Sequence, residues 1–168
     1  MKITNNLILF RSGILSNWAD TRYHAEGKDW CCSEQQYMWY KAIHFHDVET
    51  AAKIMETTNP KEIKRLGRMV RNYNDAEWQL HRAKYMYRAV KAKFTGNKHA
   101  QKFLLKQPAG HMFAEASPFD TIWGIGLAED DPQAQHPSTW RGRNLLGLLI
   151  TQVYNELKYE PNLFDNAN

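Results

Sequence analysis

The sequence lacks the features that mark several protein classes. Only two cysteines occur among the 168 residues, and they are neighbours, Cys31 and Cys32. Adjacent cysteines have poor geometry for an ordinary structural disulfide, so a reducing, cytoplasmic setting is expected. No long apolar run is present, which argues against a transmembrane helix and against a membrane partner. The first residues contain only a short apolar stretch, so no signal peptide is expected.

Several catalytic and metal-binding motifs are also missing. The sequence has no P-loop, no G-x-S-x-G and no G-x-G-x-x-G. Cys31, Cys32, His44 and His46 do not have the spacing of zinc ligands, so no metal is expected, and no cofactor. Neither sign of charge dominates, since 22 Lys and Arg against 18 Asp and Glu give a formal net charge of +4. This small excess favours an anionic partner only weakly.

The hydrophobic pattern predicts a little β-structure near the N-terminus. ILFRSG and TRYHAEGKDWCC alternate as strands do, and Glu26-Gly27-Lys28 within the second segment suits a hairpin turn. The segment HMFAEAS predicts one more short strand, whereas 117–143 is rich in Pro, Gly and Asp and predicts a long loop region.

Helix-start signals divide the rest of the chain. These signals are a Ser33–Gln36 capping box before a helix over about 34–45, Asp47, Asn59-Pro60, Asn74 or Asp75, and Asn97. Gly67 is expected to close or bend the third helix, and NLLGLLITQVYNEL predicts a buried helix near the C-terminus. The fold class is therefore α+β, mainly α-helical, with one compact domain over 1–160 and a flexible tail at 161–168.

The stretch CCSEQQYMWYKAIHF places two charged residues, Glu34 and Lys41, seven positions apart. On a helix both share a face, about 10 Å apart along the axis, which is too far for an ordinary surface ion pair. One interpretation is a helix-start carboxylate and an independent lysine whose stem packs on apolar surface. The other is that both side chains face a shared cavity, with Lys41 acting as a cation or a nucleophile.

Two later segments could also carry chemistry. In SPFDTIWGIG, Asp120 and Trp123 could hold a sugar and stack a ring, or form a turn with an aromatic anchor. In TWRGRNLLG, Arg141, Arg143 and Asn144 precede a helix, which indicates either a phosphate site or an ordinary helix cap with surface arginines.

Taken in order, these residues resemble the NADAR family, also called YbiA-like. The resemblance runs from Ser16 to about Leu157 and depends on order and spacing, because no single motif is specific. The residues that carry it are Ser16-Asn17-Trp18, Trp30 before Ser33-Glu34, Lys41, Leu66-Gly67-Arg68, Trp78 with Met86 and Phe94, Glu115, Asp120 with Trp123-Gly124, and Gly142-Arg143-Asn144 before Leu146-Gly147. The chain departs from the family pattern at Trp18, at Gln35 and in a long acidic loop at 128–140, which bears on substrate preference.

The resemblance implies a YbiA-like domain and an N-glycosidase that cuts the bond between ribose C1 and a base nitrogen. It implies catalytic roles for Glu34, Lys41 and Asp120. The substrate-binding residues that it implies are Ser16, Asn17, Arg68, Trp123, Gly124, Arg143 and Asn144. The substrate expected from it is ADP-ribosylated guanine in DNA, with a phosphoribosylated intermediate of riboflavin synthesis as the alternative.

Two other classes of function remain open. A non-catalytic reader of ADP-ribose or nucleic acid needs stacking and phosphate contacts but no reactive pair. A small structural or interaction protein would explain the helices but not the paired charged and loop residues. No stable protein partner is implied. Retention of both Glu34 and Lys41 favours the enzyme.

Overall fold

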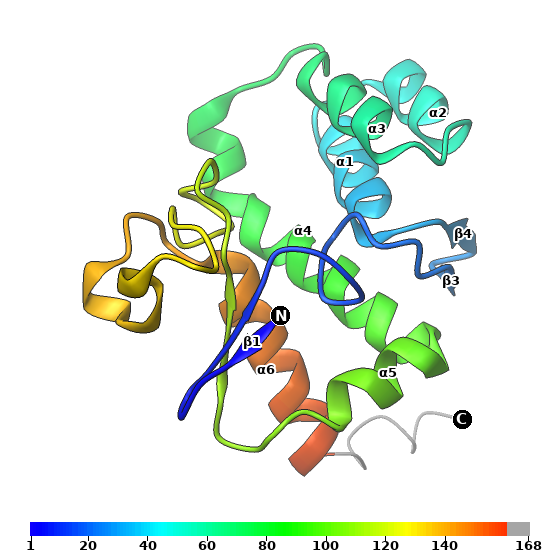
Figure 1. The fold of residues 1–168 in the computed structure, drawn as a ribbon. Coiled ribbons are helices and arrows are strands. Elements are labelled where there is room, and N and C mark those ends of the chain that lie inside the picture. The colour runs from blue at the N-terminus through cyan, green and yellow to red at the C-terminus, as the bar shows by residue number, and fades with distance from the viewer. Residues whose placement is uncertain (161–168) are drawn as a thin grey trace. The chain divides into compact units, whose positions relative to one another are not determined.

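The computed structural model describes residues 1–160, so the tail expected at 161–168 lies outside the described residues. Six α-helices and five strands occur within the described part, which confirms the prediction of a mainly helical α+β fold (Figure 1). The chain divides into two compact units, one made of Met1–Ser16 with the chain from Gln101 onwards, and one made of Asn17–Ala100. Across the described residues, no helix is long and apolar enough to cross a membrane.

The first unit is built around a three-stranded sheet. Its strands, in sheet order, are β1 (Lys2–Ile3), β2 (Leu7–Phe10) and β5 (Met112–Glu115). β1 and β2 are antiparallel, whereas β2 and β5 are parallel, and all four β2 residues are buried. α6 (Leu145–Tyr159) packs against β5, which confirms the predicted buried helix and the predicted strand in HMFAEAS. The loop region after β5 contains two short 3-10 turns, Pro132–Gln135 and Pro137–Thr139.

The second unit is a group of helices with a hairpin. α1 (Ser33–His44) is in contact with α2 (Val48–Met55), α3 (Pro60–Arg68) and the long α4 (Asp75–Gly96) (Figure 1). The predicted stripe on α4 is largely buried, including Trp78, Met86 and Phe94. The second unit ends within α5 (Lys98–Leu105), which Asn97 caps by accepting the Ala100 N–H at 2.9 Å.

The hairpin forms where the turn residues predict it. β3 (Tyr23–Ala25) and β4 (Lys28–Trp30) are antiparallel and joined by Glu26 and Gly27. Both linking residues have positive φ, 54° and 69°. This is the pattern of a tight two-residue hairpin turn whose twist matches that of the strands.

Three more of the predicted helix starts are confirmed as side-chain caps. Asp47, Asn59 and Asn74 accept backbone N–H groups from Thr50, Lys61 and Glu77. These short polar side chains satisfy amide groups that have no partner within the helix.

The predicted Ser33–Gln36 capping box is wrong. Ser33 is the first helical residue of α1, and the residue before it, Cys32, makes no side-chain cap. The Ser33 hydroxyl donates to Asn17 Oδ1 at 3.0 Å. The Gln36 side chain donates to the Tyr40 hydroxyl at 3.0 Å and accepts from Tyr23 at 2.8 Å. Tertiary partners therefore occupy both groups that the local box would have used.

Gly67 lies in the last turn of α3, which ends at Arg68. A Cβ at this position would overlap the Met38 side chain of α1. The absence of a side chain therefore allows α3 to approach α1 closely.

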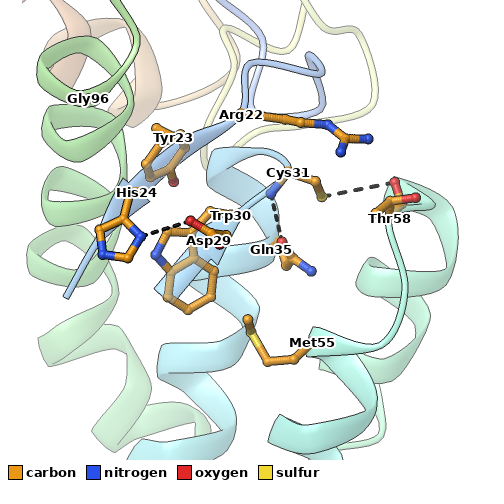
Figure 2. Close-up of a pocket in the computed structure, with 10 residues that line it drawn as sticks. All are labelled: Arg22, Tyr23, His24, Asp29, Trp30, Cys31, Gln35, Met55, Thr58 and Gly96. Carbon is orange, nitrogen blue, oxygen red and sulfur yellow. Dashed lines mark hydrogen bonds and ion pairs between the residues drawn. The ribbon is translucent and has the colours of Figure 1, made fainter. Parts of the chain in front are cut away.

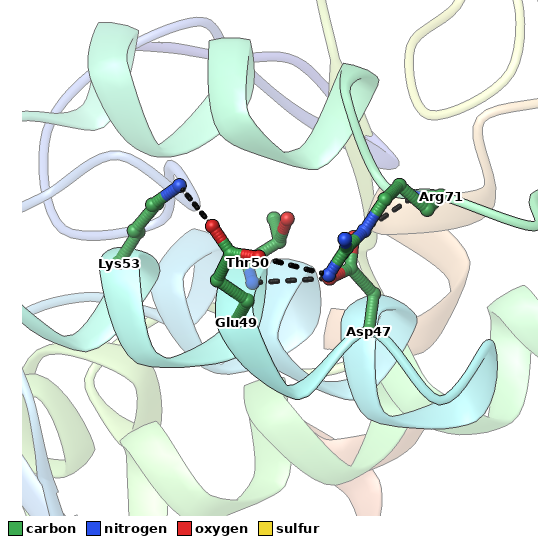
Figure 3. Close-up of polar contacts among 5 residues, drawn as sticks. All are labelled: Asp47, Glu49, Thr50, Lys53 and Arg71. Atoms are coloured by element: carbon green, nitrogen blue, oxygen red, sulfur yellow. Dashed lines mark hydrogen bonds and ion pairs between the residues drawn. The ribbon is translucent and has the colours of Figure 1, made fainter.

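A buried carboxylate ties the segment after α3 to the start of α2. Asp47 is 1% exposed and accepts from the Arg71 backbone N–H at 2.9 Å and from its guanidinium at 2.8 Å (Figure 3). The same carboxylate caps α2 through the Thr50 N–H. These hydrogen bonds hold the pKa of Asp47 well below its usual range, the Arg71 side chain contributing most.

Candidate functional site

The second unit presents Glu34, Met38 and Lys41 along one face of α1. The three residues are spaced four and three positions apart, so they share that face over about 10 Å of helix. Met38 packs against Gly67, and Lys41 donates to the Gly67 carbonyl oxygen at 2.8 Å. α3 therefore lines the side of α1 that carries Glu34 and Lys41.

Glu34 is buried at the beginning of this face. Its side chain lies in the first turn of α1, and the residue is 5% exposed. The positive end of the helix dipole favours an ionised carboxylate at such a position. The Glu34 backbone N–H donates to the Asn17 carbonyl oxygen at 3.0 Å, which satisfies one of the first amide groups of the helix.

Asn17, predicted to bind substrate, lies directly beside this turn. It is 7% exposed, and its side-chain oxygen accepts from the Ser33 hydroxyl. Its backbone oxygen holds Glu34, as described above. The structure therefore shows Asn17 positioning the first turn of α1, while its contact with substrate remains a prediction.

Lys41 is half-buried, and its ammonium group contacts the protein on two sides. One contact is the Gly67 carbonyl oxygen, and the other is the Tyr73 ring, whose centroid lies 4.0 Å from Nζ. Burial lowers the pKa of Lys41, and the nearby charge of Asp75 opposes this by a smaller amount. The sequence left open which influence prevails, and in the structure burial does.

Arg68 and Ser16 were also predicted to bind substrate. Arg68 follows Gly67 at the end of α3 and is exposed. Ser16 ends the N-terminal segment of the other unit, is half-buried, and donates its backbone N–H to the Gly13 carbonyl oxygen at 2.9 Å.

In the first unit, Asp120 builds the turn that carries Trp123. Asp120 Oδ1 accepts the backbone N–H groups of Ile122 at 3.0 Å and of Trp123 at 2.7 Å. Both Asp120 and Trp123 are half-buried. The structural interpretation of this motif, a turn with an aromatic anchor, therefore describes the local geometry, and a role in binding a sugar remains a prediction.

Gly124 follows in a tightly packed backbone. A Cβ there would lie 2.9 Å from the carbonyl oxygens of both Asp120 and Glu115. Its own carbonyl oxygen accepts the Asn144 N–H at 3.0 Å. Glycine is needed at this position because two other backbone segments pass within contact distance of it.

The beginning of α6 is capped by the loop that contains Trp123. Carbonyl oxygens of residues 121–124 accept the backbone N–H groups of Arg143, Asn144, Leu145 and Leu146, at 2.9 to 3.1 Å. These amide groups are therefore not available to a phosphate, and the ordinary-cap interpretation is correct for the backbone. The Arg143 side chain is exposed and makes no ion pair with the described residues, so a phosphate contact by its guanidinium remains a prediction.

The Asn144 side chain forms hydrogen bonds within the fold. It is 1% exposed and adopts a left-handed conformation with φ of 52°. Its Oδ1 accepts the Glu115 N–H at 3.0 Å, and its Nδ2 donates to the Phe113 carbonyl oxygen at 2.9 Å. Asn144 therefore joins the start of α6 to β5 with both ends of its amide.

The structure thus sorts the predicted residues into two groups. Asn17, Glu34, Lys41 and Arg68 belong to the second unit, around α1 and α3. The first unit contains Ser16, Asp120, Trp123, Gly124, Arg143 and Asn144, of which all but Ser16 belong to the loop after β5 and the start of α6.

Three residues near Lys41 were not predicted from the sequence. Met38 separates the two charged side chains, Tyr73 lies beneath the ammonium group, and Asp75 accepts from the Tyr73 hydroxyl at 2.6 Å. Met38 could have been found from its spacing to Glu34 and Lys41. No sequence signal connected Tyr73 or Asp75 to Lys41, because that contact depends on helix packing.

A pocket of about 590 Å³ lies elsewhere in the second unit (Figure 2). The hairpin, the start of α1 and the end of α2 line it, and it contains neither Glu34 nor Lys41. The Cys31 N–H donates to the Gln35 side chain at 2.8 Å on its wall. The Cys31 and Cys32 sulfur atoms are 3.6 Å apart, and both residues are free cysteines. Among the described residues, no group of three or more His, Cys, Asp or Glu side chains could hold a metal ion.

Known proteins resemble this chain over most of its length. The NADAR domain family matches residues 9–158. N-glycosidase R617 of Acanthamoeba polyphaga mimivirus is 34% identical over 148 residues, which cover 85% of this chain and 86% of R617. Protein irg-1 of Caenorhabditis elegans is 38% identical over 128 residues, 75% of this chain, and this match spans only 60% of irg-1.

A solved structure agrees with the fold. The NMR structure of the Escherichia coli protein YbiA superimposes with a TM-score of 0.75 at 25% sequence identity, and the match covers 95% of this chain and 89% of YbiA. With a family match over most of the chain and a 34% identical relative covered nearly in full, this protein belongs to the NADAR domain family.

Proposed function

We propose that this protein hydrolyses the bond between ribose C1 and a base nitrogen, and that its substrate is guanine carrying ADP-ribose in DNA. The chain is a hydrolase of N-glycosyl bonds, as are the relatives named N-glycosidase. The observation that carries the proposal is one face of α1. It holds a buried carboxylate, Glu34, and a lysine, Lys41, whose pKa burial lowers.

This pair fits the charge that develops during the reaction. Breaking an N-glycosidic bond builds positive charge on the ribose, and a preorganised carboxylate stabilises that charge. In this proposal the ribose lies between Glu34 and Lys41, at the level of Met38, which separates them on the helix face. Glu34 then faces the developing charge, and it later orients the water that completes the hydrolysis.

Lys41 acts in this scheme as the nucleophile. The neutral amine attacks ribose C1, the bond from C1 to the base breaks, and the base nitrogen takes up a proton as guanine leaves. The adduct opens to an imine, and water adds to it, releasing ADP-ribose and the free amine. A neutral amine is required at the first step, and the burial that lowers the pKa of Lys41 favours it.

A non-catalytic reader of ADP-ribose is the competing class. Such a protein has no need of a desolvated lysine on the same helix face as a buried carboxylate. Turnover separates the two classes, since a reader binds the modified DNA and releases nothing.

The test is release of ADP-ribose from a DNA oligonucleotide that carries ADP-ribosyl-guanine, followed by mass spectrometry. Wild type is compared with Lys41→Ala, with Glu34→Gln, which preserves side-chain shape, and with Lys53→Ala. Lys53 is an exposed lysine paired with Glu49 on α2 and serves as the control. The expected result is turnover by wild type and Lys53→Ala, with a loss of about 100-fold or more in the two site variants.

Borohydride reduction tests the nucleophile directly. Added during turnover, it should trap ADP-ribose on the peptide that contains Lys41 and leave Lys41→Ala unlabelled. Full activity of both site variants would refute the assignment of the site. If no variant releases ADP-ribose from DNA, that substrate is excluded and the same proteins are assayed on ribosylamino-pyrimidine intermediates.

A further inference from the structure

Positive charge is concentrated on α3. The helix PKEIKRLGR contains four basic residues and one acidic residue, a formal net charge of +3, against +4 for the whole chain. Nine residues thus carry most of the excess that makes the protein basic. A concentration of this kind on one element indicates a binding surface for a polyanion.

Three of these cations share one side of the helix. Lys61, Lys64 and Arg68 are spaced three and four positions apart, so they form a stripe about 10 Å long. Lys61 and Arg68 are exposed, Lys64 is half-buried, and none of the three makes an ion pair with the described residues. The fourth cation, Arg65, is neutralised by Glu62, which accepts two of its hydrogen bonds, at 2.6 and 2.8 Å.

An exposed aromatic ring lies beside this stripe. Trp18 is 39% exposed, and Lys64 Nζ lies 5.5 Å from the centroid of its ring. Such a ring is suited to stack on a nucleic-acid base, because it is large, exposed to solvent and has a cation over its face. We call Trp18, Lys61, Lys64 and Arg68 the α3 strip.

Two residues of the α3 strip directly follow residues that contact the proposed catalytic face. Arg68 follows Gly67, whose carbonyl oxygen accepts from Lys41. Trp18 follows Asn17, whose backbone oxygen accepts from the Glu34 N–H. The α3 strip and the proposed catalytic face therefore share the backbone segments at 17–18 and 67–68.

We propose that the α3 strip binds the single strand of DNA that flanks the modified nucleotide. A neighbouring base stacks on Trp18, and Lys61, Lys64 and Arg68 contact the phosphates. This inference rests on the proposed function for the identity of the strand. A single strand fits better than a duplex because an exposed ring can stack only on a base whose face is open.

The test is equilibrium binding of a labelled, unmodified single-stranded oligonucleotide, measured by fluorescence anisotropy over a range of salt concentrations. The variants are Lys61→Ala with Lys64→Ala, Trp18→Ala, and Trp18→Phe, which keeps an aromatic ring. The matched control is Lys98→Ala with Lys102→Ala, which removes two exposed lysines from α5. Thermal melting checks that each variant is folded.

The double α3 variant should reduce the slope of log affinity against log salt by about 1.4, since each phosphate contact to a single strand contributes about 0.7. Trp18→Ala should weaken binding at least about fivefold at all salt concentrations, and Trp18→Phe should restore most of it. The α5 control should bind like wild type. Equal effects of the α3 and α5 variants would overturn the proposal, because only bulk charge would then matter.

Two further probes decide what the strip recognises. Tighter binding to duplex DNA, or to RNA of the same sequence, would overturn the assignment to single-stranded DNA. Release of ADP-ribose from a modified mononucleoside should be unaffected by the Lys61 and Lys64 changes. If wild type binds the strand through the strip but releases no ADP-ribose, the proposed function fails and the binding surface stands. If Lys41→Ala loses turnover on DNA and the strip variants bind like wild type, the proposed function stands and the proposal for the α3 strip fails.

Discussion

Lys41 is held between two opposing influences on its charge. Its ammonium group lies against the Gly67 carbonyl oxygen and the Tyr73 ring, where burial lowers the pKa. Asp75, which is held by the Tyr73 hydroxyl, raises the pKa by a smaller amount. The packing of one tyrosine thus places both influences on the same lysine.

Replacement of Asp75 should move the pH profile of the enzyme. In Asp75→Asn the charge that opposes deprotonation of Lys41 is removed, so the limb on which kcat rises with pH should move to lower pH. Asp75 is exposed, so we expect a shift of less than about one pH unit, decreasing as salt is added. Glu77→Gln, which changes another acidic residue in the first turn of α4, is the control. A shift to higher pH would contradict the assignment of this limb to Lys41.

The α1–α3 contact is the element on which the site depends. Met38 and Lys41 of α1 both contact Gly67 of α3. Because Met38 lies between the two proposed catalytic residues, any change in this contact reaches both of them.

Gly67→Ala should therefore damage stability and activity together. The new methyl group overlaps Met38, and the resulting displacement should lower the free energy of unfolding by about 1–3 kcal/mol. Denaturant unfolding measures this loss. Met38→Ala makes room for the methyl group, so the double variant should lose less than the sum of the single variants. Additive losses would show that the two side chains do not compete for the same space.

The Asp47–Arg71 contact supports the segment that leads to Tyr73. The Asp47 carboxylate joins the start of α2 to Arg71 (Figure 3). Asp47→Asn should lower the free energy of unfolding by about 2 kcal/mol at neutral pH, because the charge-assisted hydrogen bonds from Arg71 are lost. Glu49→Gln, which alters the exposed partner of the same arginine, should cost much less.

The pH dependence of this contact has a defined sign. The pKa of Asp47 is lowered in the folded state, so its contribution is fully present above its unfolded value, about 3.9. The contribution is lost progressively as pH falls below that value. The difference in stability between wild type and Asp47→Asn should therefore shrink in acid. A difference that stays constant down to acid pH would contradict this assignment.

At the scale of the whole molecule, a buried lysine affects stability at neutral and alkaline pH. Lys93 of α4 is 1% exposed, and burial lowers its pKa to about 7. The unfolded chain holds that proton up to about pH 10.4. Between these values the unfolded state binds more protons, so the contribution of Lys93 to the free energy of unfolding rises with pH.

Lys93→Met should remove this dependence. The variant should be more stable than wild type below pH 7, by up to about 4 kcal/mol, and the gain should shrink as pH approaches 10. Urea unfolding at several pH values measures the difference. Lys84→Met, a change at an exposed position of the same helix, is the control. A gain that does not vary with pH would mean that Lys93 contributes through packing alone.

The features predicted correctly are those decided by neighbouring residues. The hairpin turn at Glu26-Gly27 and the caps at Asp47 and Asn74 formed as expected. Each depends on one side chain or one backbone conformation acting within three or four positions. The Ser33–Gln36 box had the same local signal, but Asn17 and Tyr23 offered those side chains better-placed partners.

The sequence by itself determined the helices, the β3–β4 hairpin and the common face of Glu34 and Lys41, because helical period, turn residues and capping act over a few residues. Only the tertiary structure decided what that face meets. Packing of α3 brought Gly67 to Lys41 and placed Tyr73 beneath its ammonium group. The tertiary structure also decided that carbonyl oxygens of the loop at 121–124, and not a phosphate, cap the start of α6. The physical reason is that burial sets the charge state of a side chain, and distant hydrogen-bond partners decide whether an amide group can bind a ligand. Both arise only when separate segments pack together.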